Sequence, residues 1–238
     1  MKNKIVLITG ANGGLGRIFV KNILDLNPKK IYCTARDINS LDEIKKLSNT
    51  IEVLPLDITD INSITNVVSK VDKLDILINN AGVNSNKGIF DNTFLDMEVN
   101  FKGTVNLTEA FFEKLKASSG KVINISSILA LVNLPILSSY CVSKSALHSF
   151  TEALRSEFKL FGGEVYEILP GPIETKMAES SPMPKTKPQE IVDAILLAIE
   201  NQEYEIYPDN FSQNIISMLK NNPEQLKKDF ASSLEEKR

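Results

Sequence analysis

The sequence predicts an α/β fold of the doubly wound type, a single-domain parallel sheet with helices on both faces. Short apolar runs alternate with helical patterns along most of the chain, and the first run passes directly into a glycine-rich turn. We find no repeat or composition break that would mark a linker, so residues 1–238 are predicted to form one domain. Such alternation favours right-handed crossovers between parallel strands, with a ligand crevice at the carboxyl ends of the strands.

About seven strands are expected, each as an apolar run bounded by turn residues or by a helical pattern. They are Lys4–Thr9, Ile31–Ala35, Ile51–Leu56, Leu74–Asn79, Lys121–Ser126, Val165–Leu169 and, seventh, Tyr204–Tyr207.

Helical spacing of apolar residues predicts the elements between these strands. The expected helices run from Leu15 to Leu26, from Ser40 to Leu47, from Ile61 to Val71, over Phe94–Lys116, from Leu147 to Phe161 and over Ile191–Ile199. Ser40 and Glu43 suggest a capping box, and Gly162-Gly163 close the fifth helix. The proline-rich segment 172–188 is expected to be a long loop, and the tail from Phe211 is expected to form two helices.

Composition excludes several classes of function. The formal net charge is −3, without the basic patches that binding to a nucleic-acid backbone requires. The apolar runs are too short to span a bilayer, and the chain enters a strand at once, which leaves no signal-peptide pattern. Two cysteines in 238 residues indicate a reducing compartment. The sequence therefore predicts a cytoplasmic protein that acts on a small molecule, with neither nucleic acid nor membrane as a partner.

The glycine-rich turn after the first strand is the first functional signal. It reads Thr9-Gly10-Ala11-Asn12-Gly13-Gly14-Leu15-Gly16 and opens a helix. Glycines let backbone N–H groups approach a pyrophosphate at a helix N-terminus, where the helix dipole favours negative charge. A dinucleotide-binding loop is therefore predicted, comprising Gly10, Asn12, Gly13, Gly14, Leu15 and Gly16.

The order of motifs resembles the short-chain dehydrogenase/reductase family. The glycine loop matches the T-G-x-x-x-G-x-G motif of that family, and four further blocks follow in order through about Tyr207. They are Asn79-Asn80-Ala81-Gly82, Asn100, Ser127 with Tyr140 and Lys144, and Pro170-Gly171. The resemblance implies a Rossmann fold and an oxidoreductase that moves a hydride between a nicotinamide cofactor and a carbonyl or alcohol.

The resemblance also assigns the rest of the cofactor site. NAD-preferring relatives carry a carboxylate where this chain has Ala35, and Arg36 follows with a fork suited to a 2′-phosphate. NADP(H) is therefore favoured, with NAD(H) as the alternative because Asp37 is adjacent and Gly13 occupies a position that is basic in many NADP-preferring relatives. Further expected cofactor contacts are Asp57 and Ile58 at adenine, Asn80, Ala81 and Gly82 at the ribose, and Pro170, Gly171, Ile173 and Thr175 at nicotinamide. Asp57 is equally well explained as an acid at a helix start.

Tyr140 and Lys144 lie four residues apart on a predicted helix, so their side chains share a face. An ammonium beside the phenol is expected to lower the pKa of the tyrosine from its usual ~10 toward neutrality. Tyr140 would then act as general acid/base. The resemblance implies that Lys144 also binds the nicotinamide ribose, that Ser127 stabilises the substrate oxygen, and that Asn100 holds a relay water.

Other features remain open at this level. His148 is interpreted as an ordinary helix residue, and no residue cluster has metal-ligand spacing. A redox regulator without turnover is the competing class, although such proteins typically lose the Tyr/Lys pair. A homodimer or homotetramer is compatible with the family resemblance. The loop residues Met177 and Met183 suggest an adaptable, partly apolar pocket, but the substrate is not determined.

Overall fold

The architecture is a seven-stranded parallel sheet in a computed structural model that describes residues 1–88, 90–91 and 94–234. The strand order is β3-β2-β1-β4-β5-β6-β7, and every neighbouring pair is parallel. The strands are β1 Ile5–Ile8, β2 Lys30–Ala35, β3 Ile51–Pro55, β4 Ile76–Asn79, β5 Lys121–Ile125, β6 Glu164–Ile168 and β7 Glu205–Ile206. The predicted fold class is confirmed, and the strand order reverses direction between β1 and β4, where a ligand crevice is expected.

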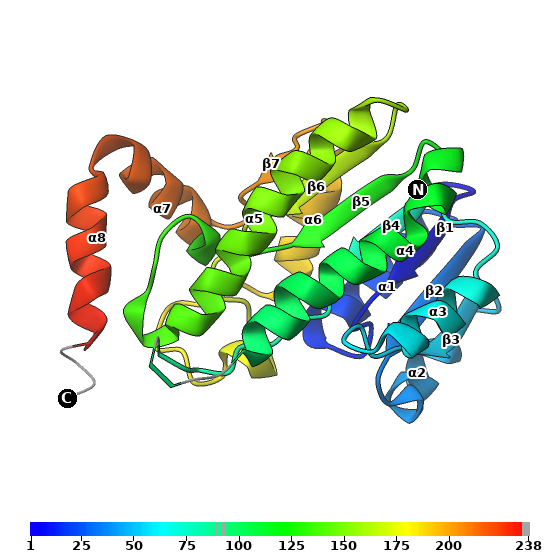
Figure 1. Cartoon of the computed structure of the whole chain (residues 1–238), viewed down its shortest axis with the longest axis horizontal. Coiled ribbons are helices and arrows are strands. Elements are labelled where there is room, and N and C mark those ends of the chain that lie inside the picture. The colour runs from blue at the N-terminus through cyan, green and yellow to red at the C-terminus, as the bar shows by residue number, and fades with distance from the viewer. Residues whose placement is uncertain (89, 92–93, 235–238) are drawn as a thin grey trace.

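Helices cover both faces of the sheet (Figure 1). They are α1 Gly14–Asp25, α2 Asp42–Lys45, α3 Ile61–Lys70, α4 Thr104–Ala117, α5 Ser138–Lys159, α6 Pro188–Glu200, α7 Asn210–Asn221 and α8 Pro223–Ala231. One apolar cluster joins the sheet to α1 and α6, and a second joins the opposite face to α3, α4 and α5. Strands buried on both faces explain the nearly continuous apolar runs in the sequence.

The expected capping box of Ser40 and Glu43 is wrong. Asp37 caps a 3₁₀ turn over Ile38–Leu41 by accepting from Asn39 N at 3.0 Å, and Ser40 donates to the Asp37 carbonyl. Glu43 instead pairs with Lys46 on the surface. The short acid at position 37 therefore begins the helical segment three residues earlier than the sequence pattern suggested.

The long helix expected over Phe94–Lys116 contains a wider turn. Residues Met97–Gly103 form a π-helical segment that leads into α4. Such segments often occur at functional sites, because an extra residue in the helical turn redirects the neighbouring side chains. This segment contains the candidate residue Asn100.

The C-terminal tail forms the two expected helices, which extend to one side of the sheet in Figure 1. The start of α7 is fixed by a capping box in which Asp209 accepts from Ser212 N at 2.8 Å. A third apolar cluster then joins α7 and α8 to the segment between β5 and α5. The tail is thus packed against the part of the chain that precedes Tyr140.

Candidate functional site

A continuous cleft of about 1650 Å³ opens at the carboxyl ends of the strands. It extends from the glycine loop and the end of β2 to Ser127, Tyr140 and the loop after β6. Single-ligand pockets measure about 300–1,000 Å³, so this cleft has room for a dinucleotide and a second small molecule side by side. All the predicted site residues line it except Asn100, which lies behind its wall.

The glycine loop has a shape that side chains would destroy. Gly10 adopts a φ of +61°, and a Cβ on Gly16 would lie 2.3 Å from the Gly10 carbonyl oxygen. Among the described residues, no side chain caps the N-terminus of α1, and its first turn contains no acid. The loop therefore leaves a positive helix end facing the cleft, which fits a pyrophosphate.

Asn80 and Thr9 hold this loop in place. Asn80 Nδ2 donates to the carbonyls of Thr9 and Gly10 at 2.9 and 3.1 Å. Thr9 Oγ1 in turn accepts from the backbone N–H groups of Asn80 and Ala81, both at 2.9 Å. The segment after β4 thus fixes the glycine loop while its residues through Gly82 line the cleft.

The end of the cleft beside β2 carries two arginines. Arg36 is exposed there, and Arg17 also lines the cleft, with Nε donating to Asn12 O and Nη2 to Ser40 O, both at 2.9 Å. The sequence interpretation missed Arg17, although its position directly after Gly16 could have identified it. Asp37, the residue that kept NAD(H) open, accepts from Asn39 N and is thereby engaged in a turn.

Asp57 and Ile58 also lie at this end. Asp57 Oδ1 accepts from Thr59 N at 2.9 Å and from Thr59 Oγ1 at 2.7 Å, and these bonds hold the pKa of the carboxyl below its usual value. Asp60, not Asp57, caps α3. Asp57 therefore shapes the turn before the helix. The side chain of Ile58 packs directly against Gly103, since a Cβ added to this glycine would lie only 2.8 Å from Ile58 Cγ1.

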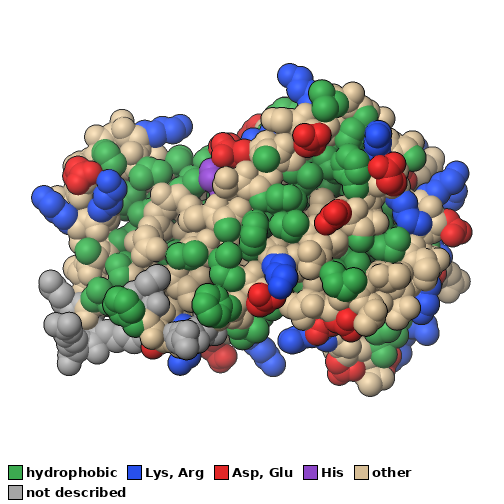
Figure 2. Space-filling model, in the orientation of Figure 1, with side chains coloured by type: hydrophobic (Ala, Val, Ile, Leu, Met, Phe, Trp, Pro, Cys, Tyr) green, Lys and Arg blue, Asp and Glu red, His purple; other side chains and the backbone are tan. Residues whose placement is uncertain are grey.

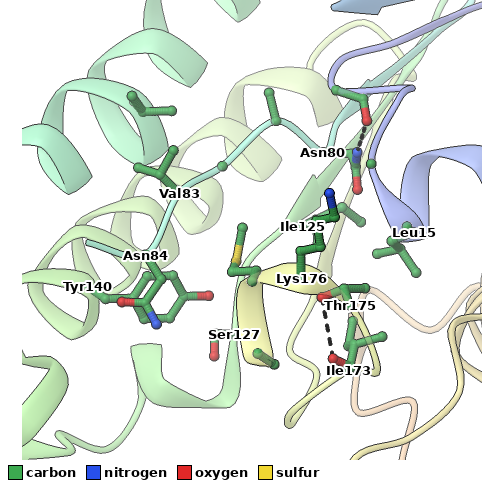
Figure 3. Close-up of a pocket in the computed structure, with 18 of the residues that line it drawn as sticks. Leu15, Asn80, Val83, Asn84, Ile125, Ser127, Tyr140, Ile173, Thr175 and Lys176 are labelled. Atoms are coloured by element: carbon green, nitrogen blue, oxygen red, sulfur yellow. Dashed lines mark hydrogen bonds between the residues drawn. The ribbon is translucent and has the colours of Figure 1, made fainter. Parts of the chain in front are cut away.

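Tyr140, Lys144 and Ser127 converge on the opposite wall of the cleft. The Tyr140 ring projects from the first turn of α5, and Figure 3 shows its hydroxyl directed toward the cleft near Ser127. Ser127 Oγ accepts from Leu129 N at 3.2 Å, and its hydroxyl also interacts with the Tyr140 side chain. Lys144, only 4% exposed, places Nζ 5.7 Å from the centre of the Tyr140 ring.

The expected lowering of the Tyr140 pKa is not found. Burial raises the pKa of Tyr140 well above its usual value, and the hydrogen bond with Ser127 only partly opposes this. Lys144 Nζ donates to Ile125 O at 2.8 Å and faces the ring of the tyrosine. Burial lowers the pKa of Lys144 to about 8, with opposing effects from Glu167 and Asp96. Desolvation therefore outweighs the attraction that the sequence argument used.

Asn100 is completely buried and organises the wall behind Lys144. Its Nδ2 donates to Val83 O and to Ser143 Oγ, both at 2.9 Å, and its Oδ1 accepts from Val83 N at 2.8 Å. Both amide hydrogens are thus used by the protein. These bonds join the π-helical segment to α5 and to the segment that follows β4, which positions Gly82 next to Lys144.

His148 has a stronger partner than the sequence suggested. Its Nδ1 lies 2.7 Å from Oε2 of Glu167. Glu167 is on β6, and its side chain is completely buried. Burial raises the pKa of Glu167, while His148 and the Ser126 hydroxyl oppose the rise. Ser126 and its neighbour Ser127 both line the cleft, and the Ser126 hydroxyl also interacts with Glu167.

The loop after β6 and the tail complete the site. Gly171 N donates to Asp209 Oδ2 at 2.9 Å, which fastens the Pro170-Gly171 turn to the start of α7. Ile173 pairs with Thr186 in a parallel bridge, so the loop 172–188 folds back on itself. Thr175 packs on the glycine loop, where a Cβ on Gly14 would lie 2.8 Å from its Cγ2. Lys176, which the sequence analysis did not single out, extends into the cleft in Figure 3.

The parallel sheet and the cleft beside its glycine loop together define a doubly wound α/β protein of the Rossmann type. The family model described as short chain dehydrogenase matches residues 4–185. The chain belongs to the short-chain dehydrogenase/reductase family, and this confirms the resemblance stated above.

The chain is similar in sequence to two curated relatives. Human dehydrogenase/reductase SDR family member 7 is 32% identical over 76% of this chain and 58% of its own length. The NADPH-dependent 1-acyldihydroxyacetone phosphate reductase of Schizosaccharomyces pombe is 32% identical over 76% of this chain and 63% of its own length. Both matches thus span less than two thirds of the relative.

Among solved structures, a short-chain dehydrogenase from Burkholderia cenocepacia in complex with NADP has a TM-score of 0.91. It is 32% identical, and the alignment covers 96% of this chain and 98% of that one. A family member from Burkholderia phymatum in complex with NAD has a TM-score of 0.83 at 19% identity, covers 94% of this chain and 95% of that one, and shows the shared fold alone. Within the described ranges, no helix has the length and apolar character needed to cross a bilayer.

Proposed function

We propose that this protein reduces a carbonyl compound with NADPH, or oxidises the corresponding alcohol, with Tyr140 as the general acid/base. The observation that carries the proposal is the convergence of Tyr140, Ser127 and Lys144 on the same cleft as the glycine loop. Bound NADP(H) would supply or accept the hydride. A regulator without turnover is less well supported, because it would not need these three groups at the cleft wall.

The protonation states suit proton donation to a carbonyl at neutral pH. The raised pKa of Tyr140 keeps the phenol protonated at neutral pH, which is the form that donates a proton to a carbonyl oxygen. The Ser127 hydroxyl can donate to the same oxygen and stabilise its developing charge. With a pKa of about 8, Lys144 is mostly an ammonium at neutral pH and suits a role in holding the nicotinamide ribose.

NADP(H) is preferred over NAD(H) because of the charges at the end of β2. Arg36 and Arg17 both line the cleft there, while one oxygen of the neighbouring Asp37 carboxylate accepts from Asn39 N. A guanidinium can bind a 2′-phosphate through two parallel hydrogen bonds. The NADP complex of the B. cenocepacia relative and the NADPH dependence of the S. pombe relative support the same choice.

Tyr140→Phe tests the proposal directly. NADPH oxidation should be followed by its near-ultraviolet absorbance with a panel of aldehydes, ketones and quinones, in the wild type and in the variant. Removing the hydroxyl should lower kcat by about 10²–10⁴-fold while NADPH affinity remains, because the lost group acts only on the reacting oxygen. Unchanged turnover in the variant, or no turnover of any carbonyl by the wild type, would reject the assignment.

We also propose that the face formed by α4 and α5 mediates self-association. Figure 2 shows apolar side chains gathered over these helices. The ring of Phe101, in the π-helical segment just before α4, meets that of Phe150 on α5 edge to face, with ring centres 6.4 Å apart. Val142 on α5 is 44% exposed. Light scattering coupled to size exclusion should give the mass of a dimer or tetramer, and a monomer at micromolar concentration would contradict this.

A further inference from the structure

The third apolar cluster has side chains that remain partly exposed. This cluster joins the tail to the segment before Tyr140. Its buried members include Ile128, Leu134 and Ile215. Five partly buried side chains pack against it and also line the cleft: Leu129, Ile136, Leu137, Met183 and Phe211. Part of the apolar surface that this cluster leaves uncovered therefore faces the cleft.

These side chains lie next to the reacting groups. Leu129 donates its backbone N–H to Ser127 Oγ, and Leu137 stands three residues before Tyr140. Met183 comes from the loop after β6 and Phe211 from the first turn of α7. Three segments that are distant in sequence, namely the connection between β5 and α5, the loop after β6 and α7, thus build one wall that begins at Ser127 and continues to the tail.

The chemistry of the wall is that of an aliphatic pocket. None of the five side chains carries a hydrogen-bonding N–H or O–H group, and four of them are aliphatic or a thioether. A long flexible side chain such as Met183 adapts to irregular apolar ligands. A single aromatic, Phe211, offers little stacking for a planar ring system. Polar or charged substituents would lose their hydration against this wall without gaining partners.

Resting on the hydride-transfer function proposed above, we infer that the substrate is a carbonyl compound with an aliphatic chain, or the matching alcohol. Its oxygen would face Tyr140 and Ser127, and its chain would lie along the wall formed by Leu129, Ile136, Leu137, Met183 and Phe211. The C-terminal tail is then part of the substrate site, since α7 supplies one of these side chains and packs against the others.

A chain-length series tests the inference. NADPH-dependent reduction should be measured for the unbranched aldehydes from butanal to decanal. Burial of each added methylene should raise kcat/KM by about fourfold until the wall is filled. A flat or falling series, or preference for an aromatic ketone of equal hydrophobicity, would overturn it.

Binding measured without turnover separates this inference from the proposed function. Calorimetric titration with the alcohols from butan-1-ol to decan-1-ol, in the presence of NADPH, which cannot accept a hydride from them, should show the same rise with chain length. If the alcohols bind in this way but no aldehyde is reduced, hydride transfer is refuted and the aliphatic site stands. If aldehydes are reduced without any dependence on chain length, the function stands and the aliphatic site is refuted.

A matched pair of variants locates the effect. Met183→Gln places an amide of similar size in the wall and should reduce the gain per methylene, with about fourfold or greater loss for decanal and much less for butanal. Met218→Gln makes the same change at a partly buried residue of the same cluster that does not line the cleft, and should leave the gain unchanged. Equal effects of the two variants would contradict the assignment of the wall.

Discussion

Replacing Lys144 with methionine should change how stability depends on pH. Burial lowers the pKa of Lys144 from 10.5 to about 8. At roughly 1.4 kcal/mol per pH unit, holding this ammonium in the folded protein costs about 3 kcal/mol at neutral pH. The methionine side chain has similar length and no charge, so the variant does not carry this cost, although it also loses the 2.8 Å hydrogen bond from Lys144 Nζ to Ile125 O.

The sign of the pH dependence follows from proton binding. Between pH 8 and 10.5 the unfolded lysine keeps its proton while the folded lysine loses it, so the stability of the wild type rises with pH across this window. The hydrogen bond contributes a nearly constant offset. From about pH 7 to about pH 10, the free energy of unfolding of the wild type should therefore gain about 2–3 kcal/mol relative to Lys144→Met.

Urea unfolding of both proteins without cofactor, at several values between about pH 7 and about pH 10, measures this difference. Lys21→Met is the matched control, because Lys21 is exposed on α1 and its replacement should give a difference independent of pH. Parallel curves for the wild type and Lys144→Met would refute the burial of a charged lysine. Turnover should also be lost in Lys144→Met. Lys144 would then lower the stability of the folded protein while being needed for the reaction.

Three further changes have defined outcomes. Gly16→Ala should abolish NADPH binding in a fluorescence titration, because its Cβ would lie 2.3 Å from Gly10 O, whereas Gly13→Ala, at 3.3 Å from the same atom, should bind far better. Arg36→Ala should weaken NADPH by about 10–100-fold and leave NADH nearly unchanged, and equal losses would refute a phosphate contact. Asp209→Ala removes the cap of α7 and the hydrogen bond from Gly171 N. The free energy of unfolding in urea should fall by about 2–4 kcal/mol. A loss below about 0.5 kcal/mol would show that the tail is not held in place by Asp209.

Much of the fold could be predicted from the sequence because its signals are local. The apolar runs at Ile5–Ile8 and Ile76–Asn79 are strands buried on both faces, and such strands need little information from the rest of the chain. The end of α5 could also be predicted from the sequence, because a glycine there allows a positive φ, and Gly162 adopts a φ of +77°. The capping at Ser40 was misassigned because Asp37 competes for the same turn, and sequence spacing alone does not rank two adjacent caps.

The site divides in the same way. Motif spacing was sufficient to bring Ser127, Tyr140 and Lys144 to one place, because strand ends and helix faces determine their directions. The electrostatic consequence was mispredicted, since Coulomb attraction can be written from spacing but desolvation depends on what the tertiary fold places around Tyr140. The Glu167–His148 pair was missed for a related reason: β6 and α5 meet only in the folded protein.

The raised pKa of Tyr140 and the aliphatic wall have a common cause. Tyr140 is only partly exposed at the cleft wall, because the segment before it, including Leu134, is packed against the tail. The same packing leaves Leu137 and Phe211 facing the cleft. An apolar environment keeps the phenol protonated, and it also selects a substrate whose chain is apolar. A variant that loosens the tail, such as Asp209→Ala, should therefore lower the apparent pKa of Tyr140 and weaken the preference for long chains together. Separate responses of these two properties would show that the tail contributes to only one of them.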